Sequence, residues 1–326
     1  MTRPTPGRAM ATAPATPRDT FLSDVLRGLA RRPPALPSKY FYDARGSALF
    51  DAITALEAYY PTRTEEGIMA AHIGEIAAHV GARGGEGVVL VEYGSGSSVK
   101  TRWLLDALPA LAAYVPLDIS GEHLARVAEG LRDAYPRLPV LPLAADYTAP
   151  FALPDLPAHH RRVVYFPGST IGNYEPEDAR AMLAQMACVA GADGGLLIGA
   201  DQRKDEAVLL RAYDDEEGIT AAFNLNLLAR INRELGADFD LAAWRHEARY
   251  DAEEGRIEMH LVAAAPQTVR VAGRAFSFAA GQSIHTENSY KYVPDGLAAL
   301  AASASLRRAA RWTDPRTYFA VEFYHP

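Results

Sequence analysis

A glycine-rich turn after a short apolar run is the first place where this sequence could support chemistry. The run Val88–Val91 ends in Glu92, and Gly94, Gly96 and two serines precede a helix-like segment. In a parallel sheet this order of strand, glycine turn and helix opens a nucleotide site, because glycine lets the backbone approach a ligand and the helix presents free N–H groups. An ordinary glycine-rich turn is the alternative.

The acid before the glycines indicates a ligand with a cationic end. The pattern E-x-G-x-G-x-S lacks one glycine of the dinucleotide fingerprint G-x-G-x-x-G, which disfavours NAD. Glu92 would instead favour a cation such as the amino group and sulfonium of S-adenosylmethionine (SAM). The sequence has no G-x-x-x-x-G-K-[ST] motif, which disfavours nucleoside triphosphates.

Acids at the ends of the next two predicted strands suit an adenosine ligand. Asp118 follows residues 114–117, roughly 20 residues beyond the glycines, where an acid typically binds ribose hydroxyls. Asp118 could instead cap the next helix. Asp146 and Tyr147 follow residues 140–144 and could bind an adenine amino group and cover its ring, with a loop containing an Asx turn as the alternative.

Tyrosines on either side of a short helical pattern form a second candidate group. Tyr40 and Tyr42 precede this pattern, and Tyr59 and Tyr60 follow it. A buried tyrosine hydroxyl needs a hydrogen-bond partner. These tyrosines therefore either line a polar pocket or belong to the core, and their spacing leaves both interpretations open.

Apolar periodicity predicts an α/β fold with a parallel sheet. Five strands are expected to alternate with helices, at residues 88–91, 114–117, 140–144, 162–166 and 195–200. The pattern changes after Asp201, where we expect a helix over 212–240, a hairpin over 245–265 and antiparallel strands over 269–278 and 282–291. A helix over 295–302 and two strands within 311–324 then close the chain.

Composition excludes several classes of protein. The net charge of −7, with both signs scattered along the 326 residues, argues against nucleic-acid binding. The single cysteine, Cys188, excludes an internal disulfide and a cysteine zinc site, and we interpret it as a small core residue. The nine histidines lack metal-binding spacing, so we predict no metal.

Other features of the chain concern its location and assembly. No apolar run approaches the roughly 20 residues of a membrane span, so no membrane partner is expected. Residues 1–17 are rich in Pro, Thr and Ala, without the apolar block of a secretory signal, and we predict a disordered tail. We expect a cytoplasmic monomer.

Five separated motifs resemble one family. They read KYFYDARGSALFDAITALEAYYPTRTE, VEYGSGSSVKTRWLL, FPGSTIGNY, AYDDEEGITAAFN and IHTENSYKY. In this order they resemble the ergothioneine-pathway L-histidine Nα-methyltransferases over about residues 36–324. The resemblance implies SAM-dependent trimethylation of the α-amine of histidine to give hercynine. It also implies a Rossmann-like methyltransferase core, at residues 64–201 and 292–326, with a substrate-binding α+β domain at residues 18–63 and 202–291.

The resemblance also assigns site residues. For the methyl donor it implies Gly94 and Lys100, with Asp118 at the ribose and Asp146 and Tyr147 at the adenine. For the substrate amine, next to the reacting atoms, it implies Tyr59 and Asn173. The remaining substrate contacts would be Asn173 and Tyr213 at the carboxylate, Glu287 and Ser289 at the imidazole, and Tyr42 nearby.

One departure concerns the specificity segment. Tyr290 is a second aromatic in ENSYKY, where some members of the family carry a smaller residue. A SAM-dependent methyltransferase acting on another amino acid or an aromatic amine is therefore a second hypothesis. A third is a SAM-binding sensor without catalytic activity.

Overall fold

The computed structural model describes residues 16–81, 87–95, 99–108, 110–156 and 160–326. Most of the predicted disordered tail, residues 1–17, lies outside this range. The predicted boundary is wrong by two residues, because Thr16 caps helix α1 (Pro17–Ala30). The Thr16 hydroxyl accepts from the N–H of Asp19 at 3.2 Å, and the Asp19 carboxylate accepts from the N–H of Thr16 at 3.1 Å. This reciprocal capping box satisfies two backbone donors that the first helical turn leaves unpaired.

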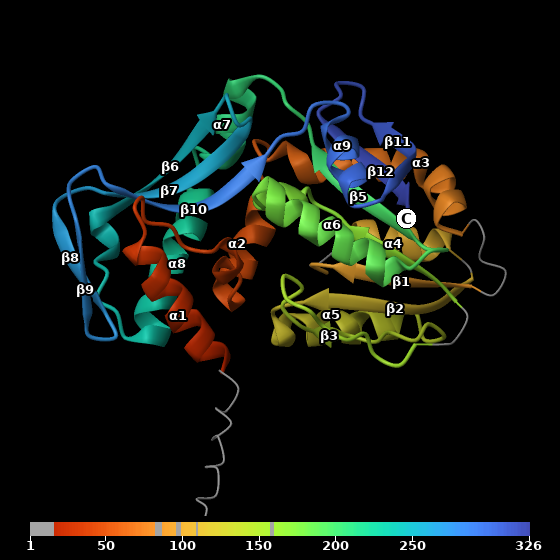
Figure 1. Ribbon diagram of the computed structural model, residues 1–326, viewed down its shortest axis with the longest axis horizontal. Coiled ribbons are helices and arrows are strands. Elements are labelled where there is room, and N and C mark those ends of the chain that lie inside the picture. The colour runs from red at the N-terminus through yellow and green to blue at the C-terminus, as the bar shows by residue number, and fades with distance from the viewer. Residues whose placement is uncertain (1–15, 82–86, 96–98, 109, 157–159) are drawn as a thin grey trace, which may run out of the picture.

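A seven-stranded sheet in the order β11-β12-β5-β4-β1-β2-β3 forms the larger part of the molecule (Figure 1). Five strands are parallel, as predicted: β1 (Val88–Tyr93), β2 (Leu111–Asp118), β3 (Leu143–Ala144), β4 (Arg161–Phe166) and β5 (Gly195–Asp201). The last two strands join antiparallel at one edge, namely β12 (Phe319–His325) and β11 (Arg307–Thr313). The carboxyl ends of the parallel strands therefore meet at one edge of the sheet.

Helices cover both faces of this sheet, which explains why its strands are almost continuously apolar. Val89 and Val91 point to the face covered by α6 (Pro176–Ala190) and α9 (Gly296–Ser303). Val88 and Leu90 point to the opposite face. That face is covered by α3 (Tyr60–Gly81), α4 (Val99–Ala107) and α5 (Gly121–Ala134). Each of these fully buried side chains contributes about 1.5–3 kcal/mol. We call this assembly the sheet unit.

A smaller unit with its own core combines two distant parts of the chain (Figure 1). Phe41 packs on Phe223 with ring centroids 4.6 Å apart. The N-terminal part supplies α1, η1 (Ser38–Phe41) and α2 (Ala44–Ala55). The later part supplies α7 (Glu206–Tyr213), α8 (Ile219–Leu235), η3 (Leu241–Ala243), β6 (Trp244–Asp251), β7 (Arg256–Ala263), β8 (Gln267–Val271), β9 (Arg274–Phe278) and β10 (Ser283–Tyr290). Strands β10, β7 and β6 form one antiparallel sheet, and β8 and β9 form a hairpin.

One predicted helix and one predicted strand differ from the observed ones. The helix expected over 212–240 is two helices, because the Asp215 carboxylate accepts from the N–H groups of Ile219 and Thr220 at 2.8 Å and starts α8. The strand expected over 114–117 is longer and begins at Leu111, after α4 ends at Ala107.

The alternation of strands and helices is also less regular than predicted. The strand expected over 140–144 is reduced to Leu143–Ala144, and the described residues between β3 and β4 contain no helix. Cys188 is exposed and not a core residue, because the buried face of α6 passes through Met182, Leu183 and Met186. Within the described ranges, no helix is long and apolar enough to cross a membrane.

Candidate active site

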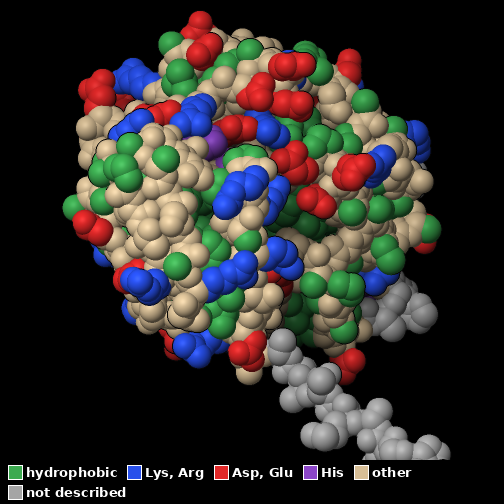
Figure 2. Space-filling view, turned by 60° about the vertical axis from the view of Figure 1, so that its left-hand side comes forward, with side chains coloured by type: hydrophobic (Ala, Val, Ile, Leu, Met, Phe, Trp, Pro, Cys, Tyr) green, Lys and Arg blue, Asp and Glu red, His purple; other side chains and the backbone are tan. Residues whose placement is uncertain are grey.

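A cavity of about 1160 Å³ lies between the two units. Figure 2 shows a hollow near the middle of one face of the molecule, with charged side chains around it. Nine of the eleven predicted site residues line the cavity: Tyr42, Tyr59, Gly94, Lys100, Asp118, Asp146, Tyr147, Asn173 and Glu287. These residues come from both units and are far apart in the sequence. The fold therefore brings most of the predicted site together.

The glycine turn opens onto this cavity at the end of β1. Gly94 has a φ of +71°, and its N–H donates to the carbonyl of Leu117 at 2.8 Å. A Cβ at this position would stand 3.6 Å from the hydroxyl of Tyr147, in a backbone conformation that disfavours a side chain. Glycine therefore keeps the turn and the space beside Tyr147.

Glu92, the acid before the glycines, lies on the cavity wall with its carboxylate already bonded. It accepts from the hydroxyl of Thr101 at 2.8 Å and from that of Tyr114 at 2.5 Å. Burial raises the pKa of Glu92 to about 7, although both hydroxyls and Lys100 oppose the rise. A cationic ligand would favour the ionised form of this carboxyl.

The ribose-binding role of Asp118 stays a prediction, and Asp118 is not the cap of α5, whose N-cap is Ser120. Asp118 lies at the end of β2 and lines the cavity, as a ribose-binding acid would. One of its oxygens also accepts from the N–H of Ser120 at 2.8 Å, just before α5. Burial raises the pKa of Asp118, and this backbone bond opposes the rise.

Lys100 has a partner that the sequence does not reveal. Its ammonium pairs with Glu65 of α3, whose side chain is fully buried. The Glu65 carboxylate also accepts from the N–H of Gly168, at 3.1 and 3.0 Å from its two oxygens. Glu65 therefore joins the helix after the glycine turn to the loop after β4. Its only signal in the sequence is a place in a helical pattern, which a solvated glutamate would share.

Asp146 also has a distant partner. Lys39, from the smaller unit, donates to its carboxylate at 3.0 Å. Burial would raise the pKa of Asp146, but the bonds from Thr148 and Lys39 hold it below its ordinary value. The neighbouring Tyr147 packs against Tyr93, with ring centroids 5.3 Å apart. An adenine-binding role for Asp146 requires sharing its carboxylate with Lys39.

Asn173 and Glu287 meet on the cavity wall. Asn173 ends η2 (Thr170–Asn173), after β4, and its amide donates to the Glu287 carboxylate of β10 at 3.1 Å. Burial raises the pKa of Glu287 to about 7, against the attraction of Lys291. Burial also keeps the pKa values of Tyr42 and Tyr59 well above 10, so both phenols stay neutral. This side of the cavity thus offers one carboxylate among neutral polar groups.

Tyr213 and Ser289 do not line the cavity, and lie behind its wall. Their hydroxyls are 2.7 Å apart, and both accept from the buried ammonium of Lys291. The Tyr213 ring lies edge-on to the ring of Tyr59, with centroids 6.0 Å apart. Direct contact of Tyr213 and Ser289 with a substrate stays a prediction.

The second aromatic of the specificity segment, Tyr290, is not among the lining residues. Its hydroxyl donates to Glu175 at 2.5 Å and accepts from Arg256. Tyr290 therefore joins the smaller unit to the start of α6 and does not crowd the cavity.

The raised pKa of Glu287 predicts a pH dependence of stability. The folded protein holds this proton up to about pH 7, whereas the unfolded chain releases it near the ordinary value of 4.5, so stability falls as pH rises through this window. Glu287→Gln removes the titration. We expect its free energy of unfolding, relative to that of the unchanged protein, to rise by about 2 kcal/mol between pH 5 and 8. Urea unfolding at several pH values measures this difference, and a constant difference would contradict the prediction.

In the part of the chain that the structure describes, no group of three or more His, Cys, Asp or Glu side chains could hold a metal ion.

Comparisons with known proteins show which family the chain belongs to. A family model described as histidine-specific methyltransferase, SAM-dependent, matches residues 21–326. The histidine N-alpha-methyltransferase of Mycolicibacterium smegmatis is 44% identical over 303 residues, which cover 91% of this chain and 92% of that protein.

Two further relatives extend the comparison. The histidine N-alpha-methyltransferase of Mycobacterium tuberculosis is also 44% identical, over 91% of this chain and 92% of its own length. Ergothioneine biosynthesis protein 1 of Neurospora crassa is 32% identical over 88% of this chain, which corresponds to 32% of that longer protein. The resemblance of the five motifs is thereby confirmed, and the chain belongs to the SAM-dependent, histidine-specific methyltransferases.

Proposed function

We propose that this protein transfers three methyl groups from SAM to the α-amino group of L-histidine, giving hercynine for ergothioneine biosynthesis. The observation that carries the proposal is the pairing of Asn173 with Glu287 on the wall of a cavity whose other side has the glycine turn and Asp118. One side suits an adenosine ligand, and the other suits an amine next to an imidazole.

The residues at the glycine turn fit the methyl donor. Gly94 leaves open space beside Tyr147, and Asp118 and Lys100 also face the cavity. Together they would hold the adenosine and amino-acid parts of SAM, which supplies an activated methyl group. Asp118 would accept from the ribose hydroxyls and Lys100 would bind the carboxylate.

The residues at the substrate amine favour its reactive form. The amine must be neutral to attack, and a carboxylate beside it would stabilise the ammonium. Tyr59 and Asn173 are neutral, and can orient the amine without holding its extra proton. Catalysis then depends mainly on the positioning of nitrogen, methyl carbon and sulfur. Proton loss to solvent between transfers is sufficient, so no dedicated base is required.

The product carries a permanent positive charge that the site must tolerate. The rings of Tyr42 and Tyr59 lie on the cavity wall. Aromatic faces attract a quaternary ammonium with about 0.5–2 kcal/mol. Successive methylation therefore does not require a negative side chain at the amine.

Glu287 is the residue that we assign to substrate selection. Its ionised carboxylate can accept from an imidazole N–H. The alternative of another amino acid or aromatic amine rests on crowding by Tyr290 and Tyr292, and neither of them is among the residues that line the cavity.

We also propose the domain division 18–63 with 202–291, and 64–201 with 292–326. The separate apolar cores of the smaller unit and the sheet unit support it. The first boundary falls within α3, whose Tyr60 packs in one core and Ile68 in another. The cytoplasmic location, the monomeric state and the absence of nucleic-acid or membrane partners stay predictions.

Mass spectrometry of the protein incubated with SAM and a mixture of all amino acids tests the proposed function. We expect a gain of three methyl groups on histidine alone. Methylation of another amino acid would remove Glu287 from the imidazole-binding role. SAM binding without methylation of any amino acid would favour the sensor hypothesis.

A further inference from the structure

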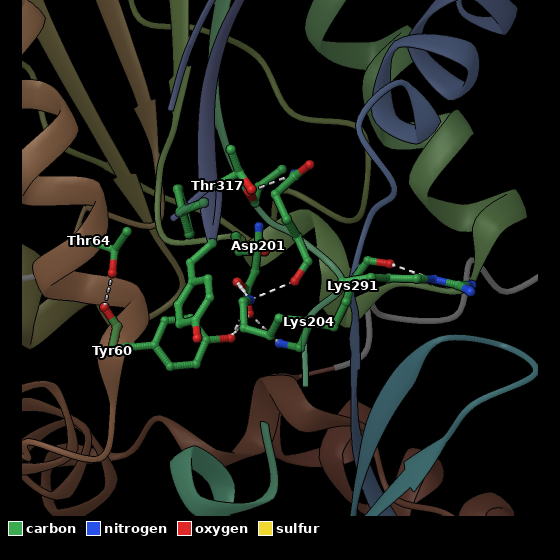
Figure 3. Close-up of polar contacts among 12 residues, drawn as sticks. Tyr60, Thr64, Asp201, Lys204, Lys291 and Thr317 are labelled. Atoms are coloured by element: carbon green, nitrogen blue, oxygen red, sulfur yellow. Dashed lines mark hydrogen bonds and ion pairs between the residues drawn. The ribbon is translucent and has the colours of Figure 1, made fainter. Parts of the chain in front are cut away.

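A buried cluster of charges lies directly behind the substrate side of the cavity. Lys291 and Lys204 converge on the Asp201 carboxylate at the end of β5 (Figure 3). The side chains of Lys291 and Asp201 are fully buried, and that of Lys204 is 3% exposed. The hydroxyl of Tyr60 donates to the same carboxylate at 2.6 Å. From the sequence, Asp201 is predicted only to follow the fifth strand.

Lys291 fixes the direction of the hydroxyls of Tyr213 and Ser289. Its three N–H groups reach Asp201 at 2.8 Å, Tyr213 at 2.8 Å and Ser289 at 2.7 Å. A hydroxyl has one proton and two acceptor positions. The two hydroxyl oxygens are 2.7 Å apart, so one hydroxyl donates its proton to the other. The accepting hydroxyl also accepts from Lys291, so both of its acceptor positions are filled. That hydroxyl can only donate to a third group, and the side chain of Tyr59, on the cavity wall, is within hydrogen-bonding reach of Tyr213.

A donor at this position selects for an acceptor in the ligand. A carboxylate only accepts hydrogen bonds, whereas an ammonium only donates them. The edge-on contact of Tyr213 with Tyr59 places this hydroxyl pair one layer behind the cavity wall. The pair therefore suits an acceptor better than an amine. The candidate acceptors are the substrate carboxylate, which the resemblance assigns to Tyr213, and the imidazole nitrogen, which it assigns to Ser289.

The charge of the cluster leads to the same conclusion. Lys204, Lys291 and Asp201 together carry one positive charge in excess, which Asp314 near Lys204 and an ionised Glu287 near Lys291 offset in part. Burial lowers the pKa of Lys204 to about 8, so this lysine is still charged at neutral pH. A buried excess charge is costly unless an opposite charge approaches it. Lys291 also lowers the pKa of Glu287 against the effect of burial, as expected for a positive charge close to the wall.

Building on the proposed function, we infer that Lys291 is a positioning residue for the substrate carboxylate. Its ammonium holds the hydroxyls of Tyr213 and Ser289 as donors and supplies the positive charge that favours an anionic group next to the methylated amine. Lys291 acts through these hydroxyls and through Tyr59, and does not touch the reacting atoms.

Kinetics with L-histidine and L-histidinamide test this inference, because the amide keeps the amine and the imidazole but loses the negative charge. We expect Lys291→Met to lower kcat/KM for histidine by about 10- to 100-fold, the size expected for a lost charged hydrogen bond, mainly through KM. For histidinamide the change should stay below about threefold, within the effect of a weak neutral contact.

Two further variants keep the test decisive. Lys204→Met also removes one positive charge, but Lys204 pairs with Asp201 and not with the two hydroxyls. It should lower kcat/KM for histidine as well, by a smaller factor. Lys291→Gln keeps a donor without the charge and serves if Lys291→Met does not fold. Equal losses of kcat/KM for histidine and histidinamide would show that Lys291 has a merely structural role. No loss for either substrate would show that it does not position the carboxylate. Failure of the unchanged protein to methylate histidine would instead refute the proposed function, and the comparison of acid with amide would then use the amino acid that it does methylate.

Discussion

Glu287→Ala is expected to lower kcat/KM for L-histidine by about 100-fold or more, because it removes the only acceptor that we assign to the imidazole N–H. The change also leaves the Asn173 amide without the partner that it has at 3.1 Å. A site built to hydrogen-bond a substrate loses about 3 kcal/mol when its partners are left unpaired. Steady-state kinetics with varied histidine measure this loss.

The affinity for SAM provides the internal control for Glu287→Ala. Asp118, on the SAM side of the cavity, is untouched by this change, so the Kd of SAM should stay within about twofold, the range of a surface substitution. Glu253→Ala, an exposed glutamate in the turn between β6 and β7, is the matched control variant and should have no effect. A fully active Glu287→Ala enzyme would refute the assignment of Glu287 to the imidazole.

Glu65→Ala is expected to lower the free energy of unfolding by about 3–5 kcal/mol, because it leaves a buried cation without its partner. The Lys100 ammonium would lose its ion pair, and the Gly168 N–H would lose its acceptor. Glu65→Gln keeps an acceptor for Gly168 and should lose less. Urea unfolding at pH 7 measures both variants.

Glu75→Ala is the control on the same helix. The Glu75 side chain is 68% exposed, so its ion pair with His72 contributes about 0–1 kcal/mol. Its carboxylate also accepts from the indole N–H of Trp312 at 2.9 Å, which adds about 0.5–1.5 kcal/mol. Equal losses for Glu65→Ala and Glu75→Ala would show that the buried pair is no more important than a surface contact.

The predictable part of the site lies at strand ends. Gly94, Asp118, Asp146 and Asn173 each follow a run of apolar residues. Because parallel strands end at the same edge of a sheet, recognising the strands is enough to bring these residues together. The roles of the tyrosines cannot be predicted in this way, because no local pattern separates the two kinds. Tyr42 and Tyr59 line the cavity. The hydroxyls of Tyr40 and Tyr60 instead donate to the buried carboxylates of Asp24 and Asp201.

The partners of the site residues could not be predicted. Glu65, Lys39 and Lys291 resemble solvated charges in the sequence, and their roles depend on groups that tertiary packing brings to them. Periodicity also failed where a side chain overrides it, as when Asp215 starts a new helix inside one apolar pattern. Cys188 shows the same limit, since apolar neighbours do not tell which face of α6 a residue occupies.

The two-part origin of the smaller unit has a consequence for biosynthesis. Phe21, Val25 and Phe41 bury themselves against side chains from residues 209 to 284, yet they leave the ribosome first. At about 5–20 residues per second, the rest of their core is made roughly 10–50 seconds later. During this interval the whole of the parallel sheet is synthesised while these apolar side chains stay uncovered. The segment with Phe21, Val25 and Phe41 therefore waits uncovered until the rest of its core is made, and is a part of the nascent chain that a chaperone would meet.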